Sequence, residues 1–127
     1  MAKLLLIACG GGAGAVLRYL AAGWGQRLGD GVFPLGTLLV NVSGCLLIGG
    51  FAAAFSGPHL VREEYRLALL VGFLGGFTTF STYGYETFAL LGDGEWWRAS
   101  ANVVLSNALG LLALWVGVRI AEQIQGA

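Results

Sequence analysis

The chain has 127 residues, of which 57% are hydrophobic and only 11% are charged, and its formal net charge is zero. Soluble globular proteins carry about 25% charged residues. The composition therefore excludes an ordinary soluble domain and indicates a membrane protein.

Four long apolar runs follow one another along the chain, at residues 4–24, 35–55, 67–91 and 99–120. About 20 helical residues cross a hydrocarbon core about 30 Å thick, and each run reaches that length. The connecting stretches, residues 25–34, 56–66 and 92–98, are too short to form a soluble domain. We expect an all-α membrane protein, with a single four-helix transmembrane domain over residues 1–127.

The first run combines closely spaced glycines with one cation. Gly10 and Gly14 stand four residues apart, as Gly72 and Gly76 do in the third run, and small residues at this spacing let helix backbones approach closely. Arg18 is the only cation deep in the first run. Its side chain either extends to the membrane surface or pairs with a buried group.

The second run, which contains "GTLLVNVSG", carries three polar side chains. Thr37 and Asn41 are four residues apart and share one helix face, with Ser43 close by. Hydrogen bonding between helices is one explanation, and a polar pathway is the other.

The third run contains the stretch "GFLGGFTTFSTYGYE". Gly75 and Gly76 open the motif "GGFTT", which places poor helix formers near the middle of the run, and we expect the helix to break there. A break frees backbone carbonyl and amide groups, which at membrane depth must be satisfied by protein, water or an ion. The alternative is an intact helix in which these glycines only form a packing contact.

Beyond the predicted break, helical spacing sorts the polar and aromatic side chains into faces. Phe80 and Tyr83 share one face, while Thr82 and Glu86 share another with Thr79, and Ser81 is offset from both. Hydroxyl groups can bond to their own helix, but an ionisable group within a span indicates a functional site.

The fourth run adds further polar groups. Asn102 and Ser106 are four residues apart on one face, and Asn107 points elsewhere. The only histidine, His59, lies in a loop, and no nucleophile and base are expected to meet. An enzyme is therefore not expected, and a permeation pathway for a small ion fits better.

The basic residues give only a weak bias for the orientation of the chain in the membrane. Four of them fall on the side of both termini and two or three on the opposite side. The chain is therefore expected to insert both ways round and to pair as an antiparallel, dual-topology homodimer. The two groups are Lys3, Arg62, Arg66 and Arg119, against Arg27 and Arg98 with Arg18.

Three motifs, "GGAGAVLRY", "GTLLVNVSG" and "GGFTTFSTYGYE", resemble those of the Fluc (CrcB) family of fluoride channels over nearly the whole chain. The resemblance implies a homodimer in the inner (plasma) membrane that exports fluoride passively and protects the cell from it. It also implies a structural sodium ion at the dimer interface. Fluoride, sodium, a second copy and the lipid bilayer are the expected partners, and no nucleic-acid partner is expected.

The resemblance also assigns residues. It implies that the carbonyl groups of Gly75 and Thr78 bind sodium, that Asn41 donates to fluoride, and that Phe80 and the residue at 83 form an aromatic box. The family usually has Phe at this last position, where this chain has Tyr83. The expected ion pathway comprises Arg18, Asn41, Phe80, Ser81, Thr82, Tyr83, Glu86 and Ser106.

Two rival functions remain open at this stage. A small dual-topology, proton-coupled multidrug or cation exporter would need a membrane carboxylate, for which Glu86 is the only candidate. A scaffold protein without transport activity would need none of these polar groups.

Overall fold

Four long helical spans make up the computed structural model, which describes residues 1–57 and 61–126. They are α1 (Ala2–Gln26), α2 (Leu35–Ala54), a third span over Glu63–Gly92, and α6 (Trp96–Gly126), and each is long and apolar enough to cross a membrane. The described residues contain no strand. The prediction of an all-α chain with four spans is confirmed, while His59 lies outside the described residues.

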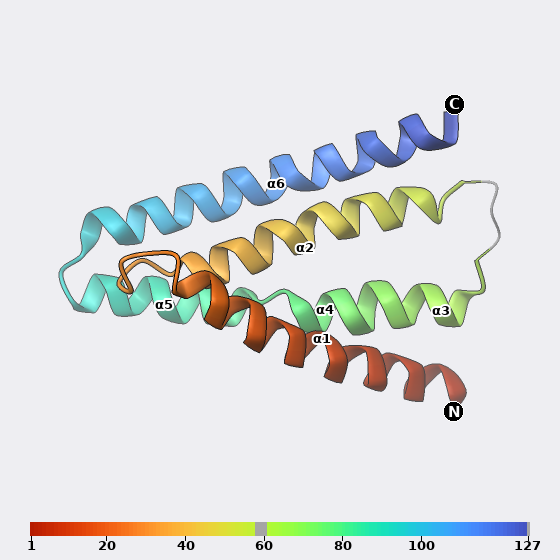
Figure 1. Ribbon diagram of the computed structural model, residues 1–127, viewed down its shortest axis with the longest axis horizontal. Helices are drawn as coiled ribbons and strands as arrows, with labels where there is room; N and C mark the ends of the chain where they lie inside the picture. The colour runs from red at the N-terminus through yellow and green to blue at the C-terminus, as the bar shows by residue number, and fades with distance from the viewer. Residues whose placement is uncertain (58–60, 127) are drawn as a thin grey trace.

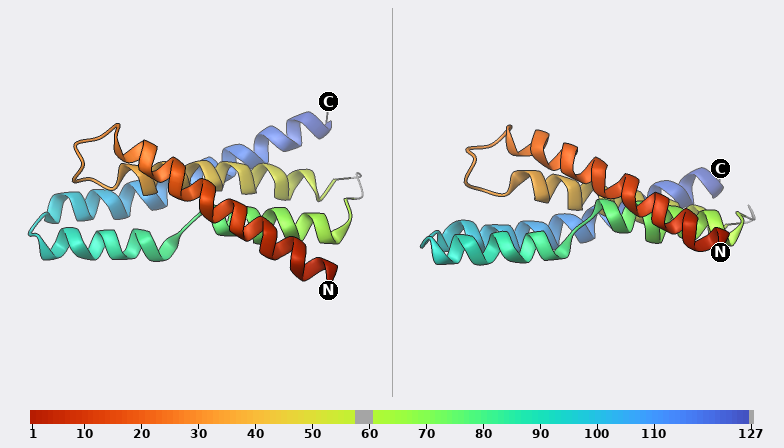
Figure 2. Two further views of the ribbon diagram at one scale, coloured as in Figure 1. Left: turned by 60° about the horizontal axis from the view of Figure 1, so that its bottom comes forward. Right: turned by 90° about the horizontal axis from the view of Figure 1, so that it is seen from below.

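The third span consists of four helical pieces. They are α3 (Glu63–Leu67), the π-helix η1 (Ala68–Leu74), α4 (Gly75–Phe77) and α5 (Phe80–Gly92). Between the last two, Thr78 and Thr79 are extended, with ψ angles of 161° and 120°. Thr78 and Thr79 leave the helix, and we call this interruption the break. A broken span is not confirmed, because the span bends by only 15° and Gly75 and Gly76 stay helical in α4. Figure 2 shows this short link.

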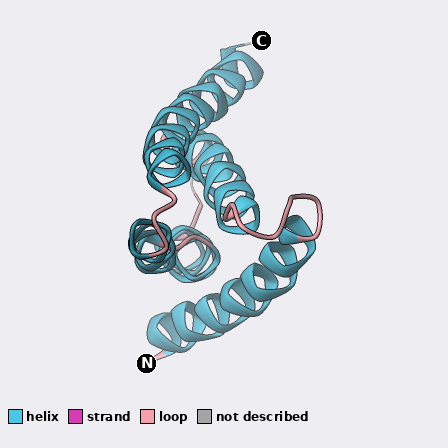
Figure 3. Ribbon diagram, turned by 90° about the vertical axis from the view of Figure 1, so that its left-hand side faces the viewer, coloured by secondary structure: helices cyan, strands magenta, loops and turns pink. Residues whose placement is uncertain are grey.

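The helices form an open bundle in which both termini lie at the same end (Figure 1). Viewed along the bundle, α2 lies between α6 and the third span, and α1 crosses obliquely (Figure 3). Helix α1 contacts η1, α4 and α2, while α6 contacts α2 and α5. The third span therefore has α1 beside its first half and α6 beside its second.

Glycines bring helix backbones into direct contact. A methyl group added at Gly14 would collide with the Phe73 carbonyl, and one at Gly76 with the Gly11 carbonyl. Gly10 and Gly72 face backbone atoms in the same interface, so the predicted close approach is confirmed. The pair α2 and α6 is built in the same way, with Gly49 against Leu114 and Gly117 against Leu46.

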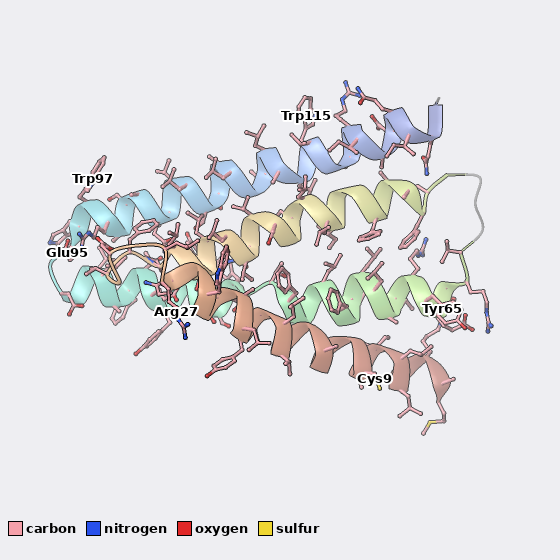
Figure 4. The ribbon with its side chains drawn as sticks, in the orientation of Figure 1. Cys9, Arg27, Tyr65, Glu95, Trp97 and Trp115 are labelled. Carbon is pink, nitrogen blue, oxygen red and sulfur yellow. The ribbon has the colours of Figure 1, made fainter. Side chains whose placement is uncertain are left out.

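The outer surface is apolar and rich in aromatic side chains. Trp97, at the start of α6, and Trp115, past its middle, are exposed and point away from the bundle (Figure 4). Tryptophan is enriched at both membrane interfaces, where the ring can contact lipid and water together. With four apolar spans, this surface is that of a multi-pass membrane protein.

Candidate functional site

Asn41 of α2 holds the peptide group at the break in the third span. Its Nδ2 donates to the Thr79 carbonyl at 2.9 Å, and its Oδ1 accepts from the Thr79 N–H at 2.8 Å. In a continuous helix, that N–H would donate to the carbonyl of Gly75. The amide of Asn41 therefore replaces a helical hydrogen bond and leaves the Gly75 carbonyl without its usual donor.

Arg18 points inward from α1 and meets the same break. Its guanidinium donates to the Thr78 carbonyl at 3.1 Å. The Thr78 hydroxyl donates to the Leu74 carbonyl at 3.0 Å, so this side chain completes the last turn of α4. Of the two alternatives that the sequence left open for Arg18, pairing with a buried group is the one observed.

Thr79 caps the helix that follows. Its hydroxyl oxygen accepts from the Thr82 N–H at 3.2 Å and lies 3.0 Å from the Thr82 hydroxyl and 3.3 Å from the Ser81 hydroxyl. A threonine at the N-cap satisfies one of the free N–H groups at a helix start. The three hydroxyl groups form a cluster at the beginning of α5, although the Ser81 and Thr82 side chains also reach the surface.

Glu86 lies one helical turn further along α5 and joins the second span. The hydroxyl of Thr37 donates to its Oε1 at 2.7 Å. Its other oxygen, Oε2, is buried and has no hydrogen-bond partner among the residues that the structure describes. Thr37 and Asn41, on one face of α2, thus reach Glu86 and Thr79, which are about two helical turns apart in the third span.

A second polar network joins α5 to α6. Asn102, which is 1% exposed, donates to the Thr87 hydroxyl at 2.9 Å, and Thr87 donates to the Tyr83 carbonyl at 2.8 Å. Ser106 donates to Asn102 Oδ1 at 3.3 Å. Sequence reasoning missed Thr87, although its place four residues after Tyr83 puts both on one helix face.

Two aromatic rings follow the break. The ring centroids of Phe80 and Tyr83 are 5.3 Å apart, with the planes tilted by 52°. The side chain of Phe80 is 81% exposed, and that of Tyr83 is half-buried. The tyrosine hydroxyl accepts from Asn107 Nδ2 at 3.4 Å, so Asn107 takes part in this region, which its position off the Asn102 face did not predict.

A cavity of about 340 Å³ lies between α1, α2 and the start of α5. It presents a guanidinium and several hydroxyl groups, all of which can donate hydrogen bonds. Most of the lining is apolar, and the hydroxyls of Thr37 and Thr79 already donate to Glu86 and Thr82. Its polar lining residues are Arg18, Tyr19, Thr37, Thr79 and Thr82.

Together, the fold and the site define a small multi-pass membrane protein with a line of hydrogen-bond donors between its helices. Residues 5–118 match the family described as "CrcB-like protein, Camphor Resistance (CrcB)". The chain belongs to this family.

Curated relatives extend the match to nearly the full length. The chain is 51% identical to a protein of Geobacter sulfurreducens over 98% of this chain and 100% of the relative. It is 44% identical to a protein of Geobacter metallireducens over 98% of this chain and 100% of the relative. It is 45% identical to a protein of Solibacter usitatus over 95% of this chain and 99% of the relative. All three relatives are named "Fluoride-specific ion channel FluC".

Proposed function

We propose that this protein is a fluoride-selective channel of the bacterial plasma membrane, which lets fluoride leave the cell down its electrochemical gradient. Near-full-length identity to proteins named as fluoride channels supports the proposal. The structural observation that carries it is the set of neutral donors around the break at Thr78 and Thr79. The family and this donor set do not favour the exporter alternative, and they describe a channel, not an enzyme.

The chemistry of the donors suits fluoride. A small, strongly hydrated anion enters a pore only if protein groups replace its water. The Asn41 amide and the hydroxyls of Ser81, Thr82 and Ser106 can donate to it, and the positive edge of the Phe80 ring can face it. Because these groups are neutral, they hold the anion without trapping it.

Two charged residues lie along the proposed route. Arg18 lines the cavity beside the break and attracts anions toward it. Glu86 lies about two helical turns beyond the break, and one of its oxygens accepts a hydrogen bond from Thr37. We assign the route to Arg18, Asn41, Phe80, Ser81, Thr82, Tyr83, Glu86 and Ser106.

We further propose that two copies assemble antiparallel. The exposure of Ser81 and Thr82 supports this assembly, because an exposed polar track is costly in contact with lipid. Phe80, also exposed, would complete an aromatic enclosure only against a second surface. A second copy in the opposite orientation would cover this face.

Of the two carbonyl groups expected to bind sodium, one is suited to the ion and the other is not. No group of three or more His, Cys, Asp or Glu side chains in the described part of the chain could hold a metal, so a cation here would depend on backbone oxygens. The Gly75 carbonyl, released from its helical donor, suits such a hard cation. The Thr78 carbonyl fits poorly, because it already accepts from the cationic side chain of Arg18. A bound sodium would cross-link peptide oxygens at the break.

The experiment is fluoride efflux from liposomes that contain the purified protein, followed with a fluoride-selective electrode. We expect rapid efflux without ATP and without a proton gradient, and little chloride efflux from matched liposomes. Chloride leaving as readily as fluoride would overturn the selectivity. Efflux that requires a proton gradient and is lost in Glu86→Gln would favour an exporter instead.

A further inference from the structure

Asn107, on α6, is the one polar contact that the structure gives to the Tyr83 hydroxyl among the described residues. Its Nδ2 lies 3.4 Å from the Tyr83 oxygen and 2.8 Å from the carbonyl of Val103, one turn earlier on its own helix. Because both contacts are made by the same atom, they must be considered together.

The contact with Val103 fixes which way the Asn107 amide faces. A backbone carbonyl only accepts hydrogen bonds, so the atom that faces Val103 must be the amide nitrogen, which has two hydrogens to donate. One goes to the Val103 carbonyl, and the other is directed at the Tyr83 oxygen. The tyrosine hydroxyl is thus the acceptor in this pair.

This arrangement leaves the proton of the Tyr83 hydroxyl available. A hydroxyl that accepts one hydrogen bond still has its own O–H to donate, and the bond it accepts polarises that O–H further. No acceptor for it lies within hydrogen-bond distance in the described part of the chain. The Tyr83 ring that carries this donor lies beside the Phe80 ring, with the ring centroids 5.3 Å apart, and both residues belong to the proposed anion route.

We infer that Asn107 is a positioning residue, which holds the Tyr83 hydroxyl so that its O–H donates to the permeating anion. This inference rests on the proposed function. It makes the aromatic pair asymmetric, because Phe80 offers only a ring edge whereas Tyr83 offers a hydroxyl donor. A hydrogen bond to an ion is stronger than one between neutral groups, and fluoride is the more strongly hydrated halide. The loss of this donor should therefore reduce fluoride flux more than chloride flux.

A double-mutant cycle in reconstituted liposomes tests the inference. The four proteins are the wild type, Tyr83→Phe, Asn107→Leu and the double variant, each measured for fluoride and for chloride efflux. Tyr83→Phe introduces the residue that the family usually has here, so the variant should still conduct. We expect its fluoride efflux to fall by roughly threefold, as the loss of one hydrogen bond does, and that of Asn107→Leu by roughly twofold. In the Tyr83→Phe background, Asn107→Leu should have no further effect.

Two controls separate positioning from folding. Tyr65→Phe removes a tyrosine hydroxyl at the far end of the same span (Figure 4) and should leave fluoride efflux unchanged. Asn107→Ala repeats the test with a smaller side chain, and every variant must elute as a single species in detergent. The fluoride-to-chloride ratio should fall with Tyr83→Phe and with both Asn107 variants, a change that a merely structural defect would not produce.

The outcomes distinguish this inference from the function on which it rests. A wild type that passes no fluoride overturns the proposed function, and this inference with it. In a conducting wild type, an equal effect of Asn107→Leu in both backgrounds overturns the inference alone. So does an unchanged fluoride-to-chloride ratio in Tyr83→Phe.

Discussion

The two halves of the third span are joined to the rest of the protein by different means. The first half, η1 and α4, contacts α1 through glycines, so that backbone lies directly on backbone. The second half, α5, is joined to α2 and α6 by side-chain hydrogen bonds from Thr37 and Asn102. The extended residues Thr78 and Thr79 separate the two halves.

This difference divides the third span into a first half that packs rigidly against α1 and a second half that carries the polar groups of the candidate site. Close backbone contact without side chains gives a rigid interface in which volume is the sensitive property. Hydrogen bonds between side chains instead leave donors and acceptors near the helix surface, where an ion can reach them. The first half should therefore tolerate changes in polarity but not larger side chains. The second half should tolerate larger side chains but not the loss of its polar groups.

The largest effect is expected from Gly14→Val in the rigid interface. The added side chain would collide with the Phe73 carbonyl and the Phe77 N–H, so the free energy of unfolding should fall by about 3 kcal/mol or more. Gly12→Ala, on the same helix, meets nothing within 4 Å and should change it by less than about 0.5 kcal/mol. Thermal unfolding in detergent measures both. Equal stability of the two variants would show that this interface can move apart.

Asn41→Asp acts at the junction between the halves and should lower fluoride efflux by at least about tenfold. An aspartate cannot donate to the Thr79 carbonyl, and its charge would repel both that oxygen and an anion. Ser43→Ala is the control, because Ser43 only donates to Val40 of its own helix. Liposome efflux is the measurement, and unchanged flux in Asn41→Asp would exclude Asn41 from the route.

Asn102→Leu tests the hydrogen bonds of the second half. It removes the link to Thr87 and the acceptor of Ser106 while roughly keeping the volume of the side chain. Hydrogen bonds between membrane helices contribute about 0.6 kcal/mol on average, so the free energy of unfolding should fall by about 1 kcal/mol. Val104→Leu, at an exposed position on α6, should have a smaller effect. A loss as large as that of Gly14→Val would contradict the comparison.

The smallest effect is expected outside the spans, at Asp30. Hydrogen bonds from the Phe33 and Val32 N–H groups, with the nearby charge of Arg98, lower the pKa of Asp30 below its ordinary value of 3.8. A carboxylate with a lowered folded pKa stabilises the fold above its unfolded pKa, and this contribution is lost as the pH falls through the folded pKa. The unfolding temperature should therefore differ slightly less between pH 7 and a pH below 4 in Asp30→Asn than in the wild type. Asp93→Asn, in the connection between α5 and α6, is the control, and identical pH profiles for both variants would exclude this role.

Much of the fold followed from the sequence. Four apolar runs of membrane-crossing length predicted four helices, and the glycine spacing predicted that helix backbones approach closely, but not which helices meet. The π-helix η1 was not predicted, because its apolar residues have no pattern that differs from that of an α-helix. The helix ends also moved, with α6 beginning at Trp96 instead of residue 99, because indole rings are accepted at a membrane interface.

The candidate site was predicted as a set of residues but not as a set of bonds. Spacing placed Thr37 and Asn41 on one face, but it could not show that each reaches a different turn of the third span. The contact of Arg18 with Thr78 and that of Asn107 with Tyr83 depend on how far neighbouring helices approach. This distance is set by packing, which a single helical pattern does not contain.

The order of the residues around the break also has a consequence for how the protein is made. Arg18 and Asn41, which satisfy the peptide groups of Thr78 and Thr79, both precede them in the chain. During synthesis, the first two spans therefore leave the ribosome before the third. An unpaired peptide group in lipid costs several kcal/mol. The hydrogen-bond partners of the Thr78 and Thr79 peptide groups are therefore present in the bilayer before the third span enters it.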